Sequence, residues 1–532
     1  MKKRAIALLL AFVLLLGVQG AMLTPNAAAA SGSDLSLGAK PSFTENEMVA
    51  HYLPGETATT LEVSASGGAG GYTYQWYYTL EESANAEATA LSGETRTTFT
   101  PDTSKALPMR FYYCVVTDSA GTTARSLRQP VIVGKTPTVT AYFSLTDNGK
   151  FVVGDNKGGG SGKVMAMQKV TVPYFDLGLY GLQNLYFRSE TYGEDPNAPG
   201  KPGSSLEPGT SAFAYGKITD LHLLIYMLEL HALALKPEQA GKGLPYQDDK
   251  LREDWDALFA PSGSAGSMFL TNYWGLGSNL TYYHNYKFPL ASKGWGATSD
   301  QVLLHDGDIL TVSRYSSVSF YSDQNAGYHH LGTQEQPNLV TQEVAQGEKL
   351  ALTLYRSCAD VENPGETIAV KVTNAPIYRV NAKSMTSGDV KDWISCGKTD
   401  EKGAITLETK NLAPGTYLFS ADGQKGSNAA PEDYVSCPGG ILVTVTGGDA
   451  PEVPDTPKPL YGDVNGDGAI DVTDVTMLQR RIAQLLTEEE LTKFQLQNAD
   501  VDGDGSISVT DVTLLQQRIA QLIKSFPVES KS

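Results

Sequence analysis

The sequence predicts a multi-domain, mainly β protein that ends in a small all-α module. The chain has 532 residues, which is too long for a single hydrophobic core. Strand-like alternation of apolar and polar residues recurs in separate regions, whereas apolar residues at helical spacing dominate only near the C-terminus. We therefore expect two β-sandwiches, an α+β domain between them and a helical module at the end.

Residues 1–30 read as a secretory signal peptide. A basic start, Met1–Arg4, precedes the apolar run Ala5–Val18, and small residues follow at Ala27–Ala30. The run is short and no second apolar segment follows it, so we expect cleavage and no membrane span afterwards. The mature protein would then be secreted and extracellular.

Residues 40–134 predict an antiparallel β-sandwich. Aromatic residues alternate with polar ones between Tyr72 and Trp76, as in a half-buried strand. A second strand surrounds Cys114, and Tyr112 stands two residues before it, as in the tyrosine corner of an immunoglobulin fold. The region resembles a bacterial immunoglobulin-like domain in which Val63 takes the place of the second cysteine. Such a domain is either a spacer or a ligand binder.

Residues 136–355 predict an α+β domain. Apolar residues within 218–235 form a helical stripe that Thr219 or Asp220 can cap. We also expect a hairpin, with strands at 301–304 and 308–313 around the turn at 305–307. Over about 215–325 the region resembles the transcobalamin C-terminal-like domain of bacterial surface proteins. The chain has no helical-barrel partner domain, so cobalamin binding does not follow from this resemblance.

Two tryptophans of this domain are candidates for a ligand platform. Trp274 and Trp295 each stand beside glycines, and we expect both to be exposed in short turns. Exposed rings could stack on a glycan or another cell-surface ligand. The alternative is that both rings fill the core, as large aromatic side chains usually do.

Residues 356–447 predict a second β-sandwich, followed by a linker. Thr367–Thr373 alternates as a strand, and Leu412–Ser420 resembles the strand–turn–strand end of prealbumin-like modules. Residues 448–459 are rich in proline and aspartate and form a semi-rigid linker to the last module, at 460–526.

A twelve-residue loop occurs twice in this last module, starting at Asp463 and at Asp500. Oxygen-bearing residues stand at positions one, three, five, nine and twelve, and a glycine at position six permits the sharp turn. Hard oxygen donors at this spacing suit Ca²⁺, so we expect two calcium ions. The predicted ligands are Asp463, Asn465, Asp467, Ala469 (carbonyl), Asp471 and Asp474 in the first loop, and Asp500, Asp502, Asp504, Ser506 (carbonyl), Ser508 and Asp511 in the second.

A helix is expected to follow each loop, because the apolar residues after it recur at helical spacing. The proline-rich stretch 451–459 cannot supply a helix that enters the first loop. Thr487 and Glu490 form a capping box that begins a further helix between the two repeats. Ile470 and Ile507, at position eight of each loop, should face one small core.

This repeat resembles the type I dockerin, the module by which secreted proteins attach to the cohesin domains of a scaffoldin. The resemblance implies a cellulosome component at the cell surface that works in plant polysaccharide breakdown. It implies cohesin contacts from loop positions ten and eleven and from the helix that follows. Those residues are Val472, Thr473, Gln479, Arg480 and Gln484 in the first half, and Val509, Thr510, Gln516, Gln517 and Gln521 in the second. Most residues are identical between the halves, so we expect two near-equal faces.

Composition excludes nucleic acid as a partner. The formal net charge is −18 and the isoelectric point is about 4.9, and no basic cluster could neutralise phosphates.

Catalytic motifs are not recognisable. Carboxylates of a glycosidase pair need no local motif, so Asp176, Glu229, Asp300 and Asp306 remain candidates within an active site at 136–355. The adjacent residues His329 and His330 read as a polar surface pair. Three functions stay open: a non-catalytic component that presents binding or adhesion modules, a polysaccharide-degrading enzyme, and a structural surface adhesin. We favour the first.

Overall fold

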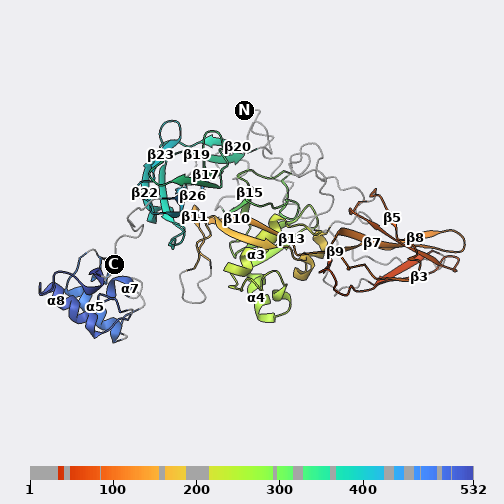
Figure 1. The fold of residues 1–532 in the computed structure, drawn as a ribbon, viewed down its shortest axis with the longest axis horizontal. Helices are drawn as coiled ribbons and strands as arrows, with labels where there is room; N and C mark the ends of the chain where they lie inside the picture. Colours follow the sequence, from red (N-terminus) through yellow and green to blue (C-terminus); the bar gives the residue numbers. More distant parts are fainter. Residues whose placement is uncertain are drawn as a thin grey trace, which may run out of the picture. The chain divides into compact units, whose positions relative to one another are not determined.

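The computed structural model confirms a mainly β, multi-domain chain with a helical C-terminal module (Figure 1). The chain divides into two compact units. None of the helices in the described part of the chain is long and apolar enough to cross a membrane. The structure describes residues 34–40, 48–83, 85–154, 162–186, 215–278, 280–290, 296–314, 327–359, 367–423, 436–447, 460–467, 469–483, 485–487, 490, 494–504 and 506–530. The predicted signal peptide and linker lie outside these residues.

Two sheets form the N-terminal sandwich. The smaller sheet has the order β1-β3-β6, and the larger has the order β2-β9-β7-β4-β5, with β8 also paired to β7. The strands are β1 (Ser36–Lys40), β2 (Ala50–Tyr52), β3 (Leu61–Ser66), β4 (Thr73–Thr79), β5 (Thr89–Ala90), β6 (Thr98–Phe99), β7 (Leu107–Thr117), β8 (Thr123–Arg125) and β9 (Gln129–Val133).

Trp76 lies at the centre of this sandwich. Its ring is 5.5 Å from that of Phe99, and its indole N–H donates to the carbonyl of Arg96 at 2.8 Å. Val63 and Cys114 belong to the same buried core. Burial raises the pKa of the Cys114 thiol to about 11, so the thiol stays protonated and inert. A large aromatic residue and small aliphatic ones thus fill the space between the sheets without a disulfide.

A third sheet carries most of the central region. Its order is β11-β10-β16-β15, with β12 also paired to β10. The strands are β10 (Thr138–Asp147), β11 (Lys150–Phe151), β12 (Gln168–Pro173), β15 (Leu280–His284) and β16 (Ile309–Arg314). A separate two-stranded sheet pairs β13 (Phe259–Ser262) with β14 (Phe269–Tyr273). The helices and 3-10 turns are η1 (Leu177–Tyr180), η2 (Gln183–Leu185), α3 (Asp220–His231), η3 (Leu244–Tyr246) and α4 (Asp249–Leu258).

Helix α3 is the predicted helix, and it is buried on all sides over its first ten residues, Asp220–Glu229. Thr219 caps it, as one of the two expected residues, and the N3 residue His222 completes a reciprocal capping box. A helix with apolar residues around its whole circumference needs protein on every face. This helix is therefore the centre of the domain.

The predicted hairpin around residues 305–307 is wrong. β16 exists close to the expected place, but its neighbours are β10 and β15. Both edges of β16 are occupied, so no edge remains for residues 301–304. Leu303 instead forms an isolated antiparallel bridge with Thr219. The turn itself is present, with Gly307 at a φ of 89°.

Two five-stranded sheets form the C-terminal sandwich. One has the order β20-β19-β17-β25, with β23 also paired to β19, and the other has the order β18-β26-β24-β21-β22. The strands are β17 (Gly327–Gly332), β18 (Thr341–Ala345), β19 (Lys349–Ala359), β20 (Thr367–Lys371), β21 (Pro376–Asn381), β22 (Ile394–Lys398), β23 (Ala404–Glu408), β24 (Gly415–Ala421), β25 (Ser436–Cys437) and β26 (Gly440–Thr446); a 3-10 turn, η6, spans Val390–Asp392. The predicted division at residues 355 and 356 lies within β19.

The histidine pair of β17 is not on the surface, so that expectation is wrong. Both imidazoles are fully buried, and β17 is an inner strand of its sheet, between β19 and β25. His330 lies within hydrogen-bond distance of the Pro337 carbonyl (2.9 Å) and the Ser357 hydroxyl (3.0 Å). Burial lowers the pKa of His329 to about 3 and that of His330 to about 4, so both are neutral.

A buried charge cluster joins three elements of the central domain. The imidazole of His284 lies 3.0 Å from Asp220, at the start of α3, and 3.2 Å from Asp308, next to β16. Although burial lowers the pKa of His284, the two carboxylates raise it to about 10. Burial raises the pKa of Asp308, but hydrogen bonds from His284 and Asn285 lower it to about 2. The cluster therefore favours an imidazolium between two carboxylates.

We expect the free energy of unfolding of this domain to fall as the pH rises from about 6.5 to about 10. The pKa of His284 rises from 6.5 to about 10 on folding, so its contribution is complete below 6.5 and is lost toward 10. Urea unfolding at several pH values should show this slope in the wild type and a smaller slope in His284→Gln. His305→Gln, whose side chain is 52% exposed, is the matched control and should keep the wild-type slope. Equal slopes for all three proteins would contradict the role of His284.

Candidate metal centres and interaction faces

The C-terminal module consists of two loop–helix units that pack on one core. The helices are α5 (Val472–Ile482), α7 (Leu496–Ala499) and α8 (Val509–Ile519), and a 3-10 turn, η7, spans Pro527–Ser530. Figure 1 shows α5 beside α8, and the two helices are in contact. Their shared core consists of Val464, Val475, Leu478, Ala499, Val501, Val512, Leu515 and Phe526. Ile470 and Ile507 pack against it, as the sequence predicts.

The first residue of each loop organises the turn that follows. In the first loop, Asp463 Oδ1 accepts the N–H groups of Gly466 (2.8 Å) and Asp467 (3.1 Å). Gly466 has a φ of 74°, a conformation that most other residues adopt only with strain. The second loop repeats this arrangement around Asp500 and Gly503. The glycine at position four of each loop is therefore required by the turn, and the predicted glycines at position six, Gly468 and Gly505, lie outside the described residues.

The last residue of each loop closes it and begins the helix. Asp474 is fully buried, and its carboxylate accepts the N–H groups of Val464 (2.7 Å), Asn465 (3.0 Å) and Asp471 (2.9 Å). Asp511 is also fully buried and accepts the corresponding three N–H groups in the second loop. Asp471 and Ser508 are the N-caps of α5 and α8, each in a reciprocal capping box. An aspartate at position twelve thus fits both loop and helix.

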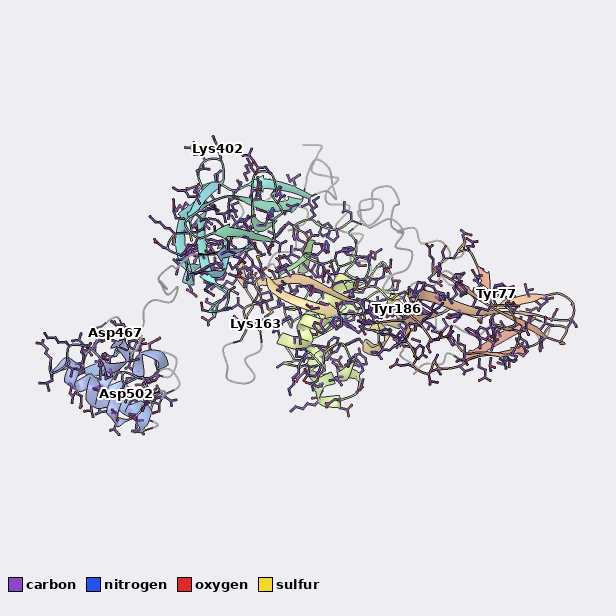
Figure 2. All side chains as sticks on the ribbon, viewed as in Figure 1. Tyr77, Lys163, Tyr186, Lys402, Asp467 and Asp502 are labelled. Carbon is purple, nitrogen blue, oxygen red and sulfur yellow. The ribbon has the colours of Figure 1, made fainter. Side chains whose placement is uncertain are left out.

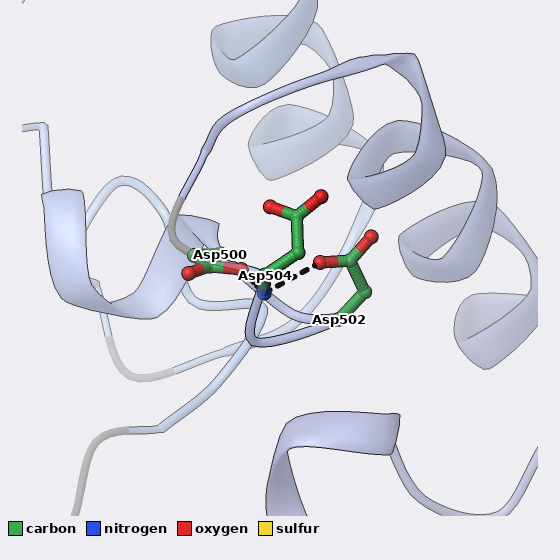
Figure 3. A group of neighbouring side chains, drawn as sticks. All are labelled: Asp500, Asp502 and Asp504. Atoms are coloured by element: carbon green, nitrogen blue, oxygen red, sulfur yellow. Dashed lines mark hydrogen bonds between the residues drawn. The ribbon is translucent and has the colours of Figure 1, made fainter.

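Three carboxylates converge in the second loop. Oxygen atoms of Asp500, Asp502 and Asp504 all lie within 4.8 Å of one another (Figure 3). Burial, and then the neighbouring carboxylates Asp511, Asp504 and Asp500, raise the pKa of Asp502. Hard oxygen donors this close, with mutual repulsion that a cation would relieve, fit Ca²⁺.

The first loop offers a similar donor set with one amide in it. Asp463, Asn465 and Asp467 occupy positions one, three and five, and Asp467 is labelled with Asp502 in Figure 2. The Asn465 side-chain amide donates to Asp467 Oδ2 at 2.9 Å, which leaves its carbonyl oxygen as the donor atom suited to a cation. Ala469 and Ser506 are exposed at position seven, and their N–H groups donate to Asp467 and Asp504.

Two residues near the end of the chain, Phe526 and Val528, pack against the loops of the module and were not predicted from the sequence. Phe526 is buried in the module core, and its ring would lie 3.0 Å from a Cβ atom placed on Gly462. The Val528 N–H donates to the Val501 carbonyl at 3.2 Å. The first contact brings the segment after α8 to the residue before the first loop, and the second joins it to the second loop. The repeat contains no signal for them, because Phe526 lies beyond the last residue of the duplicated pattern.

The predicted partner-binding residues lie mainly on the module surface. Val472 is 66% exposed and Val509 is 72% exposed, each at the first position of its helix. The structure places the others as follows: Thr473, Gln479, Thr510, Gln516 and Gln521 are exposed, Arg480 and Gln517 are half-buried, and Gln484 lies outside the described residues. Exposed valines at matching places give each half an apolar patch next to polar side chains.

Arg480 has internal partners. Its guanidinium forms a two-pronged ion pair with the carboxylate of Glu490, one bond of which measures 2.9 Å, and donates to the Leu485 carbonyl at 3.1 Å. Glu490 also accepts the N–H of Thr487 at 2.8 Å, and its own N–H donates to the Thr487 hydroxyl at 3.3 Å. The predicted capping box is therefore confirmed, and Arg480 is bound to it.

Trp274 is half-buried in a strained turn. Its φ is 60°, which is unusual for a bulky residue, and Gly275 and Gly277 follow with φ values of 75° and 82°. One stacked contact joins its ring to Phe143, with centroids 6.5 Å apart. Trp295 lies outside the described residues. Of the two predicted platform residues, the structure therefore describes only Trp274, whose ring packs partly against the core.

Each of the four candidate carboxylates is held by hydrogen bonds. Asp176 accepts the N–H groups of Met48, Val49 and Gly178 and the hydroxyl of Tyr186, which is labelled in Figure 2. Glu229 accepts the Tyr180 hydroxyl (2.8 Å) and the Gly241 N–H (2.7 Å), and burial raises its pKa to about 7. Asp300 accepts from Thr298 and Gly266, and Asp306 accepts the N–H of Thr140. Asp176, Glu229 and Asp300 are buried, whereas Asp306 is exposed.

Comparison with protein families identifies the C-terminal module. Residues 461–520 match the family model of the dockerin type I domain. No curated protein matches the chain.

Comparison with solved structures gives similarities of low TM-score. The ScaB dockerin of Acetivibrio cellulolyticus, in complex with the third cohesin of ScaC, has 31% identity, a TM-score of 0.12, and coverage of 14% of this chain and 99% of its own. SGBP-B of Bacteroides ovatus, in complex with a mixed-linkage heptasaccharide, has 10% identity, a TM-score of 0.15 and coverage of 78% and 70%. Three N-terminal domains of the bacteriophage RB49 protein Hoc have 9% identity, a TM-score of 0.14 and coverage of 78% and 100%. Because all three TM-scores are far below 0.5, we base no conclusion on these structures.

We expect residues 460–532 to fold only with calcium. The carboxylates of each loop repel one another until a cation neutralises them, and the core of this module is small. Amide dispersion in NMR spectra of this fragment should collapse in excess EGTA and return when Ca²⁺ is added. Asp500→Ala with Asp502→Ala should abolish binding of one ion in calorimetry and leave the other. Unchanged dispersion in EGTA would show that the loops fold without the metal.

Proposed function

We propose, from the dockerin type I domain at residues 461–520, that this protein is a secreted, calcium-dependent cellulosome component. Its C-terminal module would dock onto a cohesin domain of a scaffoldin, and the β-domains would serve as non-catalytic binding or adhesion modules in polysaccharide breakdown. The observation that carries this proposal is the pair of loop–helix units with acidic loops and exposed apolar helix starts.

The metal would act by holding each loop in its binding-competent shape. The residues that would hold it are those at loop positions one, three, five, seven, nine and twelve, from Asp463 and from Asp500. Position twelve is also the N3 residue of the following helix, so the loop and the first helical turn share a side chain in each half. Ordering the loop would therefore order Val472 and Val509, which begin the helices.

The non-catalytic part of the proposal is supported by the carboxylates of the central region. Asp176 and Glu229 are buried and accept several hydrogen bonds each, as structural carboxylates do. Asp300 is also buried and holds two loop segments together. An enzyme would release reducing sugar from a polysaccharide, whereas a binding module would be retarded in glycan affinity gels and an adhesin would do neither.

We expect the two helix starts of the module to provide two cohesin-binding faces. Val472→Asp with Thr473→Asp, and separately Val509→Asp with Thr510→Asp, should each leave cohesin binding measurable in calorimetry. The four substitutions together should abolish it, because a carboxylate then replaces the apolar contact on both faces. All these positions are exposed, and an aspartate in the first turn of a helix is tolerated, so folding should persist.

The control for this experiment is the fold of each variant. Amide dispersion and calcium affinity should equal those of the wild type, which assigns any loss of binding to the surface. If one pair of substitutions alone abolished binding to every cohesin, the module would have a single face.

A glycan platform at Trp274 is a second candidate function of the central domain. The half-buried indole in a strained turn favours it, because strain of this kind is often retained at binding sites. Trp274→Ala should then reduce retention in polysaccharide affinity gels and barely lower the melting temperature. Trp255→Ala is the matched control: this ring is 1% exposed, and its loss should cost about 3–5 kcal/mol. A comparable loss of stability in Trp274→Ala would assign that ring to the core.

A further inference from the structure

The two halves of the C-terminal module differ at positions that bear on their interaction faces. Most aligned residues are identical, but Asn465 corresponds to Asp502, Asp471 to Ser508, and Arg480 to Gln517. The first two pairs lie in the loops, and the third lies in the helices. The structure shows what each of these differences does to the neighbouring face.

In the first half, the Thr473 hydroxyl has two internal partners. It donates to Asp471 Oδ1 at 2.6 Å and accepts the side-chain amide of Asn465 at 2.9 Å. The amide nitrogen that makes this bond is not an atom that a cation would take. The hydrogen bond from the Asn465 amide to Thr473 can therefore persist while the carbonyl oxygen of Asn465 binds a metal ion.

In the second half, the hydroxyl of Thr510 has no such partners within the described residues. Asp502, at the position of Asn465, offers no donor, and Ser508 accepts only the backbone N–H of Thr510, at 3.0 Å. Within the described part of the chain, the Thr510 hydroxyl has no hydrogen-bond partner. It remains available to a molecule that approaches α8.

The third difference, Arg480 against Gln517, lies two helical turns after Thr473 and Thr510, on the same side of each helix. Arg480 is occupied by Glu490 and the Leu485 carbonyl, as described above. Its counterpart Gln517 makes no side-chain hydrogen bond within the described residues. No equivalent of Glu490 exists either, because Pro527 stands at that place in the second half.

We infer that the two faces are unequal: the face that carries Thr510 and Gln517 binds the cohesin more tightly than the face that carries Thr473 and Arg480. This inference rests on the proposed docking function. A partner that uses the first face must compete with bonds that the module makes to itself, including a charge-assisted ion pair. A partner that uses the second face finds an exposed Val509 beside a hydroxyl and an amide that have hydrogen-bonding capacity to spare.

The partner surface that fits this face is uncharged and mixed apolar and polar. Val509 offers an apolar contact, and Thr510, Gln516 and Gln517 offer hydroxyl and amide groups without formal charge. The cohesin residues that meet this face should therefore provide hydrogen-bond donors and acceptors around an apolar spot. Binding through it should depend little on salt, because no ion pair has to form.

The test compares the faces in the full chain by calorimetry with a panel of type I cohesins that includes the third cohesin of ScaC of Acetivibrio cellulolyticus. Val509→Asp with Thr510→Asp should weaken binding about tenfold or more, and Val472→Asp with Thr473→Asp about twofold or less. In the first of these variants, adding Asn465→Asp, Asp471→Ser and Arg480→Gln should restore most of the affinity. These three substitutions give the first half residues that the second half already carries, so the fold accommodates them.

Met477→Leu is the matched control, since it also copies the second half but packs against the module core, and it should restore nothing. Glu490→Gln separates the effect of the Arg480 ion pair from that of the Thr473 hydrogen bonds, because it releases Arg480 and leaves Thr473 bound. Equal loss from both pairs of aspartates, or no gain from the three transferred residues, would overturn the inequality and leave the docking function standing. Failure of the wild-type chain to bind any cohesin of the panel would overturn the docking function and this inference with it.

Discussion

Electrostatic repulsion within two short loops is the constraint on which the C-terminal module depends. Asp500, Asp502 and Asp504 bring carboxylate oxygens within 4.8 Å of one another, and the first loop places Asp463 and Asp467 at matching positions. Hydrogen bonds from loop amides to Asp463, Asp474 and their counterparts fix the backbone around this charge. Asp474 and Asp511 also complete the capping boxes of α5 and α8, so loop geometry, helix initiation and the exposed valines form one connected arrangement.

The sequence predicted those structural features that depend on a repeat or on a local pattern of residues. Loop ligand spacing, the caps at Thr219 and at Thr487 with Glu490, and the alternation of the sandwich strands depend on residues close together in the chain. The left-handed glycines Gly466 and Gly503 stand at position four and were not singled out, although a left-handed turn admits few other residues. Fold class and the type of the terminal module followed from these local patterns.

Features that depend on distant residues could not be predicted in the same way. The hairpin at 305–307 was wrong because β10 and β15, far apart in the chain, occupy both edges of β16. The histidines of β17 were assigned to the surface because their burial depends on strands that precede and follow by many residues. The ion pair of Arg480 with Glu490 was not predicted, because no local pattern shows that these two side chains meet. Phe526 lies outside the repeat, so the repeated pattern could not predict that its side chain is buried in the core.

Phe526 joins the end of the module to its beginning. Phe526 packs beside Gly462, so the chain enters and leaves the module at neighbouring points. A unit whose two ends meet can be joined to an unrelated chain at one place without requiring the host to span a distance. Its hydrophobic core consists of residues of the module itself, from Val464 to Phe526. The packing of Phe526 therefore suits a module that is attached to the rest of a chain through a single linker.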